Sequence, residues 1–363
     1  MKIIFVCDHG HFGGATQMLV WVASQMKKKG HDIRVLTFCS SQDFRSYDDS
    51  LVFDDFNFKE RTQNEKRSMV DFIKLNRDYF NYMKQHRPDV VVNFGDHSFY
   101  LSFFYKKLLN YYFVISERVD PFYPISKLAV IRRKLYNFAD GAVFQTAKAQ
   151  SYFSNRIIKK SRVIFNPVKL KSNNYWKHSK HDKSFIYVGR IDINQKRLDL
   201  LIDAFNDFCK DNNRYILKIY GTGSEKNTQR LQQMVAMYNL EKKVVFKGYI
   251  DDVASVLLEN EIFVLTSDFE GIPNSLIEAM AVGMPVISSD CSPGGARVLV
   301  QDKENGLLFE RGNKEQLVSL MNEIVDNHKM QIRMGENARQ SLSKFTEDTI
   351  SSQWEDFFLN IRS

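Results

Sequence analysis

Short apolar runs alternate with longer helical segments along this chain of 363 residues, and this alternation constrains the fold more than any other feature. It is typical of α/β domains with parallel sheets. In the first half we expect a strand at residues 2–8, a helix from Thr16 to Lys29 capped by Gly30, and a charged loop or irregular helix from Asp43 to Arg67. Further strands are predicted at Asp32–Phe38, Asp89–Phe94, Tyr112–Ser116, Gly141–Gln145 and Arg162–Phe165. The pattern therefore predicts one Rossmann-like domain in this half.

A second series of the same kind follows a polar, lysine-rich stretch without hydrophobic periodicity. Its predicted strands are Phe185–Val188, Ile216–Tyr220, Val244–Phe246, Ile262–Leu265, Pro285–Ser288 and Gly306–Phe309. The end of the chain has apolar residues at helical spacing. We therefore expect a Rossmann-like domain at residues 1–168, a linker at 169–183, a second Rossmann-like domain at 184–345 and a C-terminal helix at 346–363.

The sequence argues against several simple classes of protein. No apolar run approaches the roughly 18–20 residues that a membrane-spanning helix needs, and the apolar opening stops at Asp8 with no cleavage-like site after it. The four cysteines lie far apart without a C-x-x-C pair, and the eight histidines show no metal-ligand spacing. We therefore expect a cytoplasmic protein without disulfides or zinc.

Positive charge is concentrated in the first half. The net charge of the chain is +8, and residues 1–168 contain 26 Lys and Arg against 16 Asp and Glu, so the remainder is slightly acidic. This asymmetry indicates that the first domain faces an anionic partner, the alternative being a solvated basic surface without one.

The most specific segment runs from Asp268 to Met280, directly after a predicted strand. Pro273 suits the first turn of a helix, so we expect Glu270 in the loop before that helix and Glu278 just over one turn inside it. Two carboxylates about 7–8 Å apart at a strand end can reach hydroxyls at opposite ends of a sugar–diphosphate–ribose unit. Taken alone, the pair would also fit two ordinary glutamates near a helix terminus.

This segment resembles the E-x7-E signature of the family 4 retaining glycosyltransferases, and the match extends through D-F-E-G-x-P-N-x-x-x-E-A-M-A-x-G-x-P-V-I. The resemblance implies the GT-B fold, in which two Rossmann-like domains face a central cleft and the C-terminal helix crosses back to the first domain. It also implies that Glu270 contacts the transferred sugar and Glu278 the nucleotide ribose. The expected enzyme is a retaining hexosyl- or N-acetylhexosaminyltransferase that uses a nucleotide-diphosphate sugar, with UDP-sugars favoured.

A second motif, from Tyr187 to Arg197, follows the first strand of the second half. Fixed cations at this point would stabilise the charge on a departing diphosphate, Arg190 as a planar fork and Lys196 as a point charge. In the family the equivalent Arg and Lys hold the donor diphosphate. Lys196 stands one residue later than the commonest spacing, so Arg190 matches the family pattern better. The alternative is that both cations merely face solvent.

Backbone turns complete the expected donor site, because exposed amides can hold phosphate oxygens. The residues assigned to donor binding are Gly13, Gly14, Gly189, Gly223, Tyr249, Ile250, Gly294, Gly295, Ala296 and Glu278. By the resemblance, Gly13 and Gly14 approach the donor phosphates from the first domain, whereas Tyr249 and Ile250 seat the base. The turn at Gly223 is expected to be mainly structural.

On the acceptor side, the string from Ser116 to Pro121 ends a predicted strand of the basic half. It resembles a family subgroup with E-R-x-D-P, where many relatives have histidine in place of Arg118. A guanidinium cannot act as a general base. The resemblance therefore implies that a β-phosphate oxygen of the leaving group takes the acceptor proton on the same face, which gives retention. Arg118 would bind phosphate or sugar, and Asp120 would orient the loop or the acceptor.

Three more residues are candidates for acceptor binding: Glu117, Asp96 and His97. For Glu117 an ion pair with Arg118 is an equally good interpretation. The chain contains no D-x-D triplet, which in glycosyltransferases of the other common fold holds a divalent metal on the diphosphate. We therefore expect catalysis without metal or any other cofactor.

Basic and apolar residues are interleaved in the first half and suggest a surface for an anionic bilayer. They are Lys106, Lys107, Lys127, Arg132, Arg133 and Lys134, with Phe103, Phe104, Tyr105, Phe122, Tyr123 and Ile125. Relatives with this charge pattern often act on lipid-linked glycans. We therefore expect a peripheral enzyme of surface polysaccharide synthesis at the inner face of the cell membrane, with a polyprenyl-diphosphate-linked acceptor. Ordinary core packing of the aromatic residues is the alternative.

Three other functions compete with this hypothesis. A catalytically inactive GT-B scaffold would be expected to lack Glu270, Arg190 or Lys196, and all three are present. A nucleotide-sugar epimerase would need acid and base residues around the sugar and no acceptor site. A nucleic-acid binder would explain the basic charge, but no nucleic-acid-binding module is recognisable.

Overall fold

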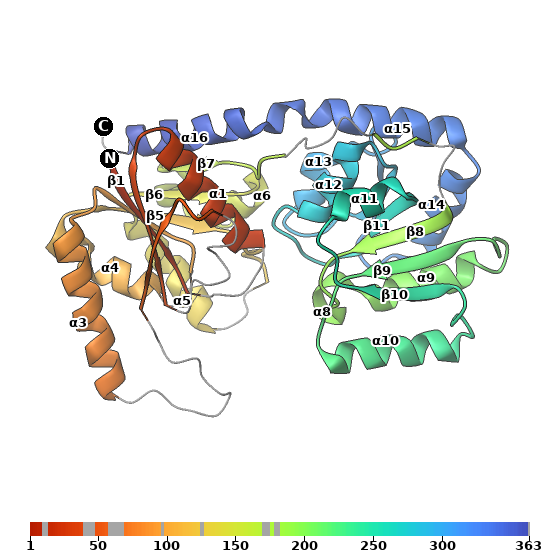
Figure 1. Ribbon diagram of the computed structural model, residues 1–363, viewed down its shortest axis with the longest axis horizontal. Coiled ribbons are helices and arrows are strands. Elements are labelled where there is room, and N and C mark those ends of the chain that lie inside the picture. Colours follow the sequence, from red (N-terminus) through yellow and green to blue (C-terminus); the bar gives the residue numbers. More distant parts are fainter. Residues whose placement is uncertain are drawn as a thin grey trace. The chain divides into compact units, whose positions relative to one another are not determined.

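The computed structural model describes residues 1–8, 14–38, 48–56, 69–95, 98–123, 127–168, 175–177 and 182–361. The chain forms two compact units: unit 1 comprises Met1–Phe165 and Asp348–Ser363, and unit 2 comprises Asn166–Glu347. Each unit is built on one sheet covered by helices (Figure 1), and every strand pair within these sheets is parallel. Two Rossmann-like α/β domains, as predicted from the sequence, are therefore confirmed.

Unit 1 has a seven-stranded sheet of order β3-β2-β1-β4-β5-β6-β7. Its strands are β1 (Lys2–Cys7), β2 (Asp32–Thr37), β3 (Val52–Asp55), β4 (Val90–Asn93), β5 (Tyr112–Glu117), β6 (Gly141–Phe144) and β7 (Ser161–Val163). Its helices are α1 (Gly14–Lys28), α3 (Met69–His86), α4 (Ser98–Leu109), α5 (Lys127–Leu135), η1 (Tyr136–Phe138), α6 (Ala147–Ser151), α7 (Asn155–Ile158) and α16 (Glu347–Asn360). Central strands such as β4 are buried along their whole length, as parallel strands covered on both faces must be.

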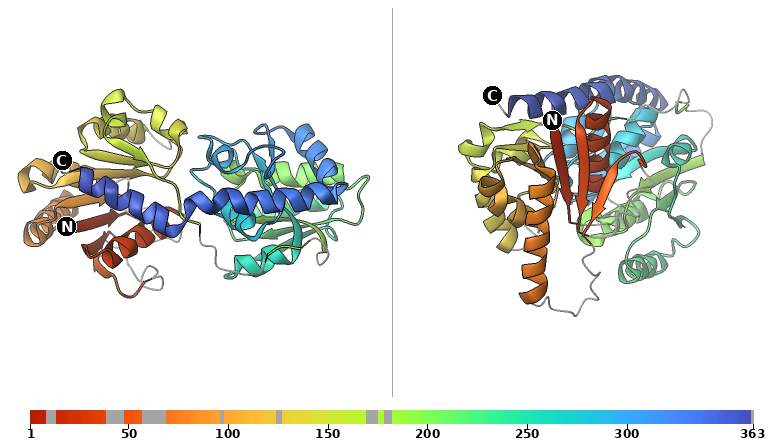
Figure 2. Two further views of the ribbon diagram at one scale, coloured as in Figure 1. Left: turned by 90° about the horizontal axis from the view of Figure 1, so that it is seen from above. Right: turned by 60° about the vertical axis from the view of Figure 1, so that its left-hand side comes forward.

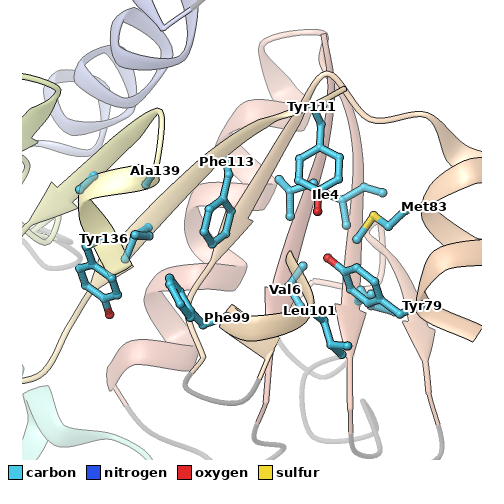
Figure 3. Packing of buried hydrophobic residues seen from close by; sticks show 14 of the residues in the cluster. Ile4, Val6, Tyr79, Met83, Phe99, Leu101, Tyr111, Phe113, Tyr136 and Ala139 are labelled. Carbon is cyan, nitrogen blue, oxygen red and sulfur yellow. The ribbon is translucent and has the colours of Figure 1, made fainter. Parts of the chain in front are cut away.

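The main core of unit 1 lies between the sheet and helices α3 and α4. Figure 3 shows Ile4 and Val6 of β1 beside Tyr79 and Met83 of α3, with Phe99 of α4 next to β5. All five side chains are fully buried. Aromatic contacts extend this core toward η1, and the whole cluster holds the carboxyl ends of β1, β4 and β5 in place.

The last helix, α16, packs on unit 1 beside β1 and α1 (Figure 2). Phe358 meets Phe5 of β1 edge to face with ring centroids 6.4 Å apart. Glu355 forms an ion pair of 2.8 Å with Lys29 at the end of α1. The chain therefore returns to its first domain at its C-terminal end, and α16 brings side chains to the sheet of unit 1.

Unit 2 has a six-stranded sheet of order β10-β9-β8-β11-β12-β13. Its strands are β8 (Asp182–Val188), β9 (Ile216–Tyr220), β10 (Val244–Gly248), β11 (Asn260–Leu265), β12 (Val286–Ser289) and β13 (Leu307–Phe309). Its helices are α8 (Ile193–Lys196), α9 (Leu198–Phe208), α10 (Glu225–Met237), α11 (Val253–Leu258), α12 (Asn274–Val282), α13 (Gly295–Leu299), α14 (Lys314–Val325), α15 (His328–Ser341) and η3 (Leu342–Phe345). The strand β8 starts at Asp182, within the stretch expected to be linker.

Two expectations about unit 1 were wrong. The stretch Asp43–Arg67 contains an edge strand, β3, which pairs with β2 and is fixed by an ion pair of 3.0 Å between Arg34 and Asp54. Arg132 and Arg133, expected at the surface, are buried with 5% and 4% of their area exposed. Among the described residues, no helix is long and apolar enough to cross a membrane.

Candidate active site

The carboxyl ends of β8, β11 and β12 lie side by side in unit 2, because these strands are neighbours in the sheet. The loop after β8 carries Arg190 and Lys196, and the loop after β11 carries Glu270. The backbone joins the two loops directly, since the amide of Asp268 donates to the carbonyl of Gln195 at 2.8 Å. Residues that are far apart in the sequence therefore meet at the carboxyl ends of the strands, where ligands of parallel α/β domains bind.

Arg190 is held by its own loop. Its Nη2 donates to Gln195 Oε1 at 2.8 Å and lies 3.2 Å from Asp192 Oδ2. Gln195 in turn donates to the carbonyl of Phe269 at 3.1 Å. The Arg190 side chain keeps 64% of its area exposed, so its guanidinium is oriented by neighbours while remaining accessible to an anion.

Lys196 and Glu270 form an ion pair across the two loops. Their side chains are only 15% and 10% exposed. Ser267 also donates to Glu270 Oε1, at 2.8 Å, and Thr266 donates to the Lys196 carbonyl at 2.8 Å. A lysine placed one position later than the family spacing thus still brings its ammonium to Glu270. The pair is well shielded from water. Charge interactions are stronger in such a shielded position than at the surface.

Glycines allow the loops at these strand ends to pack backbone against backbone. A Cβ on Gly295 would lie 1.8 Å from the carbonyl oxygen of Gly271, and one on Gly223 would lie 2.1 Å from that of Ile191. Any side chain at these two positions would push the loops apart. Gly294 precedes α13, of which Gly295 and Ala296 are the first two residues and are both buried.

The remaining donor-side candidates lie at the same end of the sheet. Glu270 precedes α12, and Glu278 is the fifth residue of that helix, with an exposed side chain. Gly189 directly follows β8. Tyr249 and Ile250 follow β10, with Tyr249 65% exposed and Ile250 half-buried. The exposed Tyr249 phenol donates a hydrogen bond to the Asp251 carboxylate, which raises the pKa of the phenol.

In unit 1 the ends of β1, β4 and β5 are also adjacent, and a small pocket of about 40 Å³ lies there. Its lining residues are Ala15, Asn93, Phe94, Gly95, Ile115, Ser116, Glu117, Arg118, Val119 and Tyr136. The pocket therefore contains two of the residues that were assigned from the E-R-x-D-P string.

Glu117 is tied into a buried network. Its carboxylate lies 3.3 Å from Arg133 Nη2 of α5 and accepts a hydrogen bond of 2.5 Å from the Tyr136 hydroxyl. The structure thus pairs Glu117 with Arg133, a cation that the sequence analysis did not connect with it. Arg133 also donates to the carbonyls of Pro121 and Asp120, at 3.0 and 3.4 Å. This network fixes the loop that follows β5.

Arg118 and Asp120 lie in that loop. Arg118 Nε donates to Ser116 Oγ at 2.8 Å, and its guanidinium carbon lies 5.5 Å from the ring centroids of both Phe94 and Trp354. Burial lowers the pKa of the Arg118 guanidinium. Asp120 is 1% exposed and accepts from the Phe122 amide at 2.9 Å, which stabilises the turn.

Gly13, Asp96 and His97 lie outside the described residues, whereas Gly14 is the first residue of α1. Sequence reasoning did not single out Gln195 or Ser267, which contact Arg190 and Glu270. Their position within or beside the two motifs was the only signal available. Within the described ranges, no group of three or more His, Cys, Asp or Glu residues could hold a metal ion.

Residues 169–341 match the family model for glycosyl transferases group 1. An uncharacterized glycosyltransferase of Haemophilus influenzae is 23% identical over 97% of this chain and 98% of its own length. A Campylobacter jejuni enzyme, the GalNAc-alpha-(1->4)-GalNAc-alpha-(1->3)-diNAcBac-PP-undecaprenol alpha-1,4-N-acetyl-D-galactosaminyltransferase, is 22% identical over 100% of this chain and 99% of its own length.

The fold has close counterparts among solved structures. HepE of Anabaena, crystallised with UDP, superposes with a TM-score of 0.84 at 18% identity and covers 99% of this chain and 100% of its own. This likeness concerns the fold, which is the GT-B arrangement of two parallel-sheet α/β domains. The part of the chain at residues 169–341 is thus a match to glycosyl transferases group 1, and the whole chain is homologous to glycosyltransferases.

Proposed function

We propose that this protein is a retaining glycosyltransferase that moves a sugar from a nucleotide-diphosphate donor held by unit 2 to a hydroxyl of a glycan acceptor held by unit 1. The observation that carries the proposal is the meeting of Arg190, Lys196 and Glu270 at the carboxyl ends of β8 and β11. Two cations and one carboxylate at these strand ends match a ligand that has an anionic diphosphate next to a sugar rich in hydroxyls.

On the donor side, Arg190 and Lys196 stabilise the diphosphate as its bond to the anomeric carbon breaks. Lys196 is paired with Glu270. When the donor binds, the ammonium turns toward the diphosphate, and the Glu270 carboxylate accepts hydrogen bonds from sugar hydroxyls. Glu278 contacts the ribose. Gly189 and the amides of Gly294, Gly295 and Ala296 add to the donor surface.

On the acceptor side, the hydroxyl oxygen forms a bond to the anomeric carbon on the face from which the diphosphate leaves. Its proton passes to an oxygen of the leaving β-phosphate, so the negative charge of the leaving group is partly neutralised. Arg118 binds phosphate or sugar in unit 1, while Asp120 keeps the loop after β5 in shape. UDP is the favoured nucleotide, since HepE, which shares the fold, was crystallised with UDP. No metal is needed, because the cations and amides take its role.

The acceptor in this proposal is linked to a polyprenyl diphosphate, and the enzyme works at the inner face of the cell membrane. The name of the Campylobacter jejuni relative describes a substrate that is linked to undecaprenol. Helices α4 and α5 lie side by side, since the Tyr100 hydroxyl donates to the Leu128 carbonyl at 3.4 Å. We define the α4–α5 surface by their exposed apolar residues and those of η1, with the neighbouring cations: Phe104, Leu108, Leu128, Ile131, Phe138, Lys107, Lys127, Lys134 and Arg156.

The α4–α5 surface differs from the membrane surface expected from the sequence. Lys106 is paired with Asp140 at 2.7 Å, and Phe103 and Tyr105 are half-buried. Leu108 and Leu128, by contrast, are 68% and 66% exposed. Exposed apolar side chains and cations on the same helices suit an anionic bilayer, because the apolar groups insert while each cation adds about 1 kcal/mol near the surface.

A donor screen tests the proposed function. The protein is incubated with a panel of nucleotide sugars in the presence of a chelator, and the release of free nucleotide is measured with and without glycan acceptors. Slow hydrolysis of one donor, accelerated by an acceptor and lost in Arg190→Ala, is the expected result. Release of nucleotide by none of the donors would point to an inactive relative, and a change of sugar configuration without release would point to an epimerase.

A further inference from the structure

The guanidinium of Arg118 is in contact with two aromatic rings that come from distant parts of the chain. Phe94 directly follows β4, whereas Trp354 belongs to the C-terminal helix α16. The guanidinium carbon lies 5.5 Å from each ring centroid, and the two rings are 6.4 Å apart at an interplanar angle of 21°. The rings are therefore nearly parallel to each other, and together with Ser116 they restrict the position of the Arg118 side chain.

The aromatic ring of Trp354 suits this contact better than it suits simple packing. The indole is fully buried, and its N–H has no hydrogen-bond partner among the described residues. A buried donor without a partner is unfavourable, and a phenylalanine would avoid that loss. An indole, however, gives the strongest cation–π interaction of the aromatic side chains, above all where water is excluded.

We propose that Trp354 is a positioning residue that holds the Arg118 guanidinium at the pocket beside the end of β5. The inference rests on the proposed function, because it matters only if Arg118 binds phosphate or sugar during transfer. Arginine has many rotamers, and a planar guanidinium fixed against aromatic faces loses less freedom when it binds an anion. The C-terminal helix thereby contributes to the acceptor side of the site although it lies more than two hundred residues from Arg118 in the sequence.

The helix offers a matched control for this role. Phe358 is one turn further along α16, is also fully buried, and packs on Phe5 and Trp354. Among the described residues, Phe358 contacts the rings of Phe5, Trp354 and Phe357, which belong to β1 and α16. Truncating either Trp354 or Phe358 to leucine removes buried ring area from the same interface, so both should lower the thermal midpoint. Only the first removes the ring that faces the guanidinium.

The test compares Trp354→Leu, Phe358→Leu and Trp354→Phe in the full chain. The measurements are kcat/KM for the acceptor, the Kd for UDP and the thermal midpoint. Trp354→Leu is expected to lower kcat/KM about tenfold, as the loss of a desolvated cation–π contact predicts, with the Kd for UDP unchanged. Phe358→Leu should keep kcat/KM within about twofold despite its lower thermal midpoint. Trp354→Phe retains a ring, so it should fold and lose less activity than Trp354→Leu.

A double-mutant cycle with Arg118→Ala separates the possible outcomes. If Trp354 acts through Arg118, adding Trp354→Leu to Arg118→Ala causes no further loss of kcat/KM. An equal loss in both backgrounds, or an equal loss in Phe358→Leu, would reduce Trp354 to a packing residue. If Arg118→Ala is slow but both Trp354 variants are normal, the inference alone is wrong. Normal transfer by Arg118→Ala would overturn the proposed role of Arg118 and this inference with it.

Discussion

The ammonium of Lys196 and the carboxylate of Glu270 form an ion pair although the two residues are 74 positions apart in the chain. Lys196 ends the short helix α8, and Glu270 stands in the loop before α12, so the pair joins the strand-end loops of β8 and β11. Both side chains are mostly buried. The pair therefore places a positive and a negative charge side by side where the proposed donor binds.

Replacing either member of the pair should abolish most of the turnover. We expect Lys196→Met and Glu270→Gln each to lower kcat by about 10²–10³-fold, the usual effect of removing one preorganised charge or donor from a transition state. Each single change also leaves a charge with little access to water, so the thermal midpoint should fall.

The double variant Lys196→Met/Glu270→Gln is the control for folding. Replacing both charges of a buried pair is often neutral for stability, so the thermal midpoint should recover while kcat stays low. Recovery of activity together with stability would show that the pair serves the fold alone. Kinetics with the preferred donor and thermal denaturation of the three variants decide between these outcomes.

The ion pair between Glu117 and Arg133 should matter for stability. Its side chains are 4% and 3% exposed, and Arg133→Met would leave the Glu117 carboxylate buried without its cation. We expect a loss of about 3–5 kcal/mol in the free energy of unfolding. Lys29→Met removes a more exposed pair with Glu355 and should cost at most about 1 kcal/mol. Denaturant titration of the two variants measures both values; equal losses would contradict the structural role given to Arg133.

The alternation of apolar runs and helices was enough to predict two parallel α/β domains, because buried parallel strands are continuous hydrophobic runs. This reasoning did not predict the edge strand β3. Only Phe53 among its four residues is buried, and the strand is fixed by contacts of Asp54 and Asp55 with residues of β2. Contacts between segments distant in sequence leave no local pattern.

The candidate site was predictable where a motif carries its chemistry in one stretch. The loop position of Glu270 and the helical position of Glu278 follow from Pro273 alone. Partners from other elements were not predictable. The burial of Arg133 in α5 against Glu117 depends on how that helix packs over β5, and its position in a run of basic residues suggested a surface instead.

The product should keep the anomeric configuration of the donor. Attack on the face from which the diphosphate leaves gives an α-glycoside from an α-linked nucleotide sugar. The coupling constant of the new anomeric proton in the NMR spectrum reports the configuration directly. An inverted product would require a general base on the opposite face and would contradict the role given to the leaving phosphate and to Arg118.

The α4–α5 surface should bind anionic vesicles in a salt-dependent manner. We expect co-sedimentation with liposomes containing acidic phospholipid at low salt and its loss at high salt. Lys107→Glu/Lys134→Glu should weaken binding at least about tenfold, since each basic residue near the membrane contributes about 1 kcal/mol. The matched control Lys226→Glu/Lys247→Glu reverses two exposed charges of unit 2 and should bind as the wild type does. Equal losses in both variants would mean that net charge, and not this surface, governs binding.

The central claim is that the strand-end loops of unit 2 hold a nucleotide diphosphate through Arg190 and Lys196 without metal. Calorimetric titration of the protein with UDP in the presence of a chelator tests it most directly. We expect binding that Arg190→Ala weakens about tenfold or more, as the loss of a charge-assisted hydrogen bond predicts. Lys314→Ala, which removes a cation paired with Asp203 and Asp207 between α14 and α9, should leave the Kd unchanged. Binding that requires magnesium or manganese, or that Arg190→Ala does not weaken, would contradict the account.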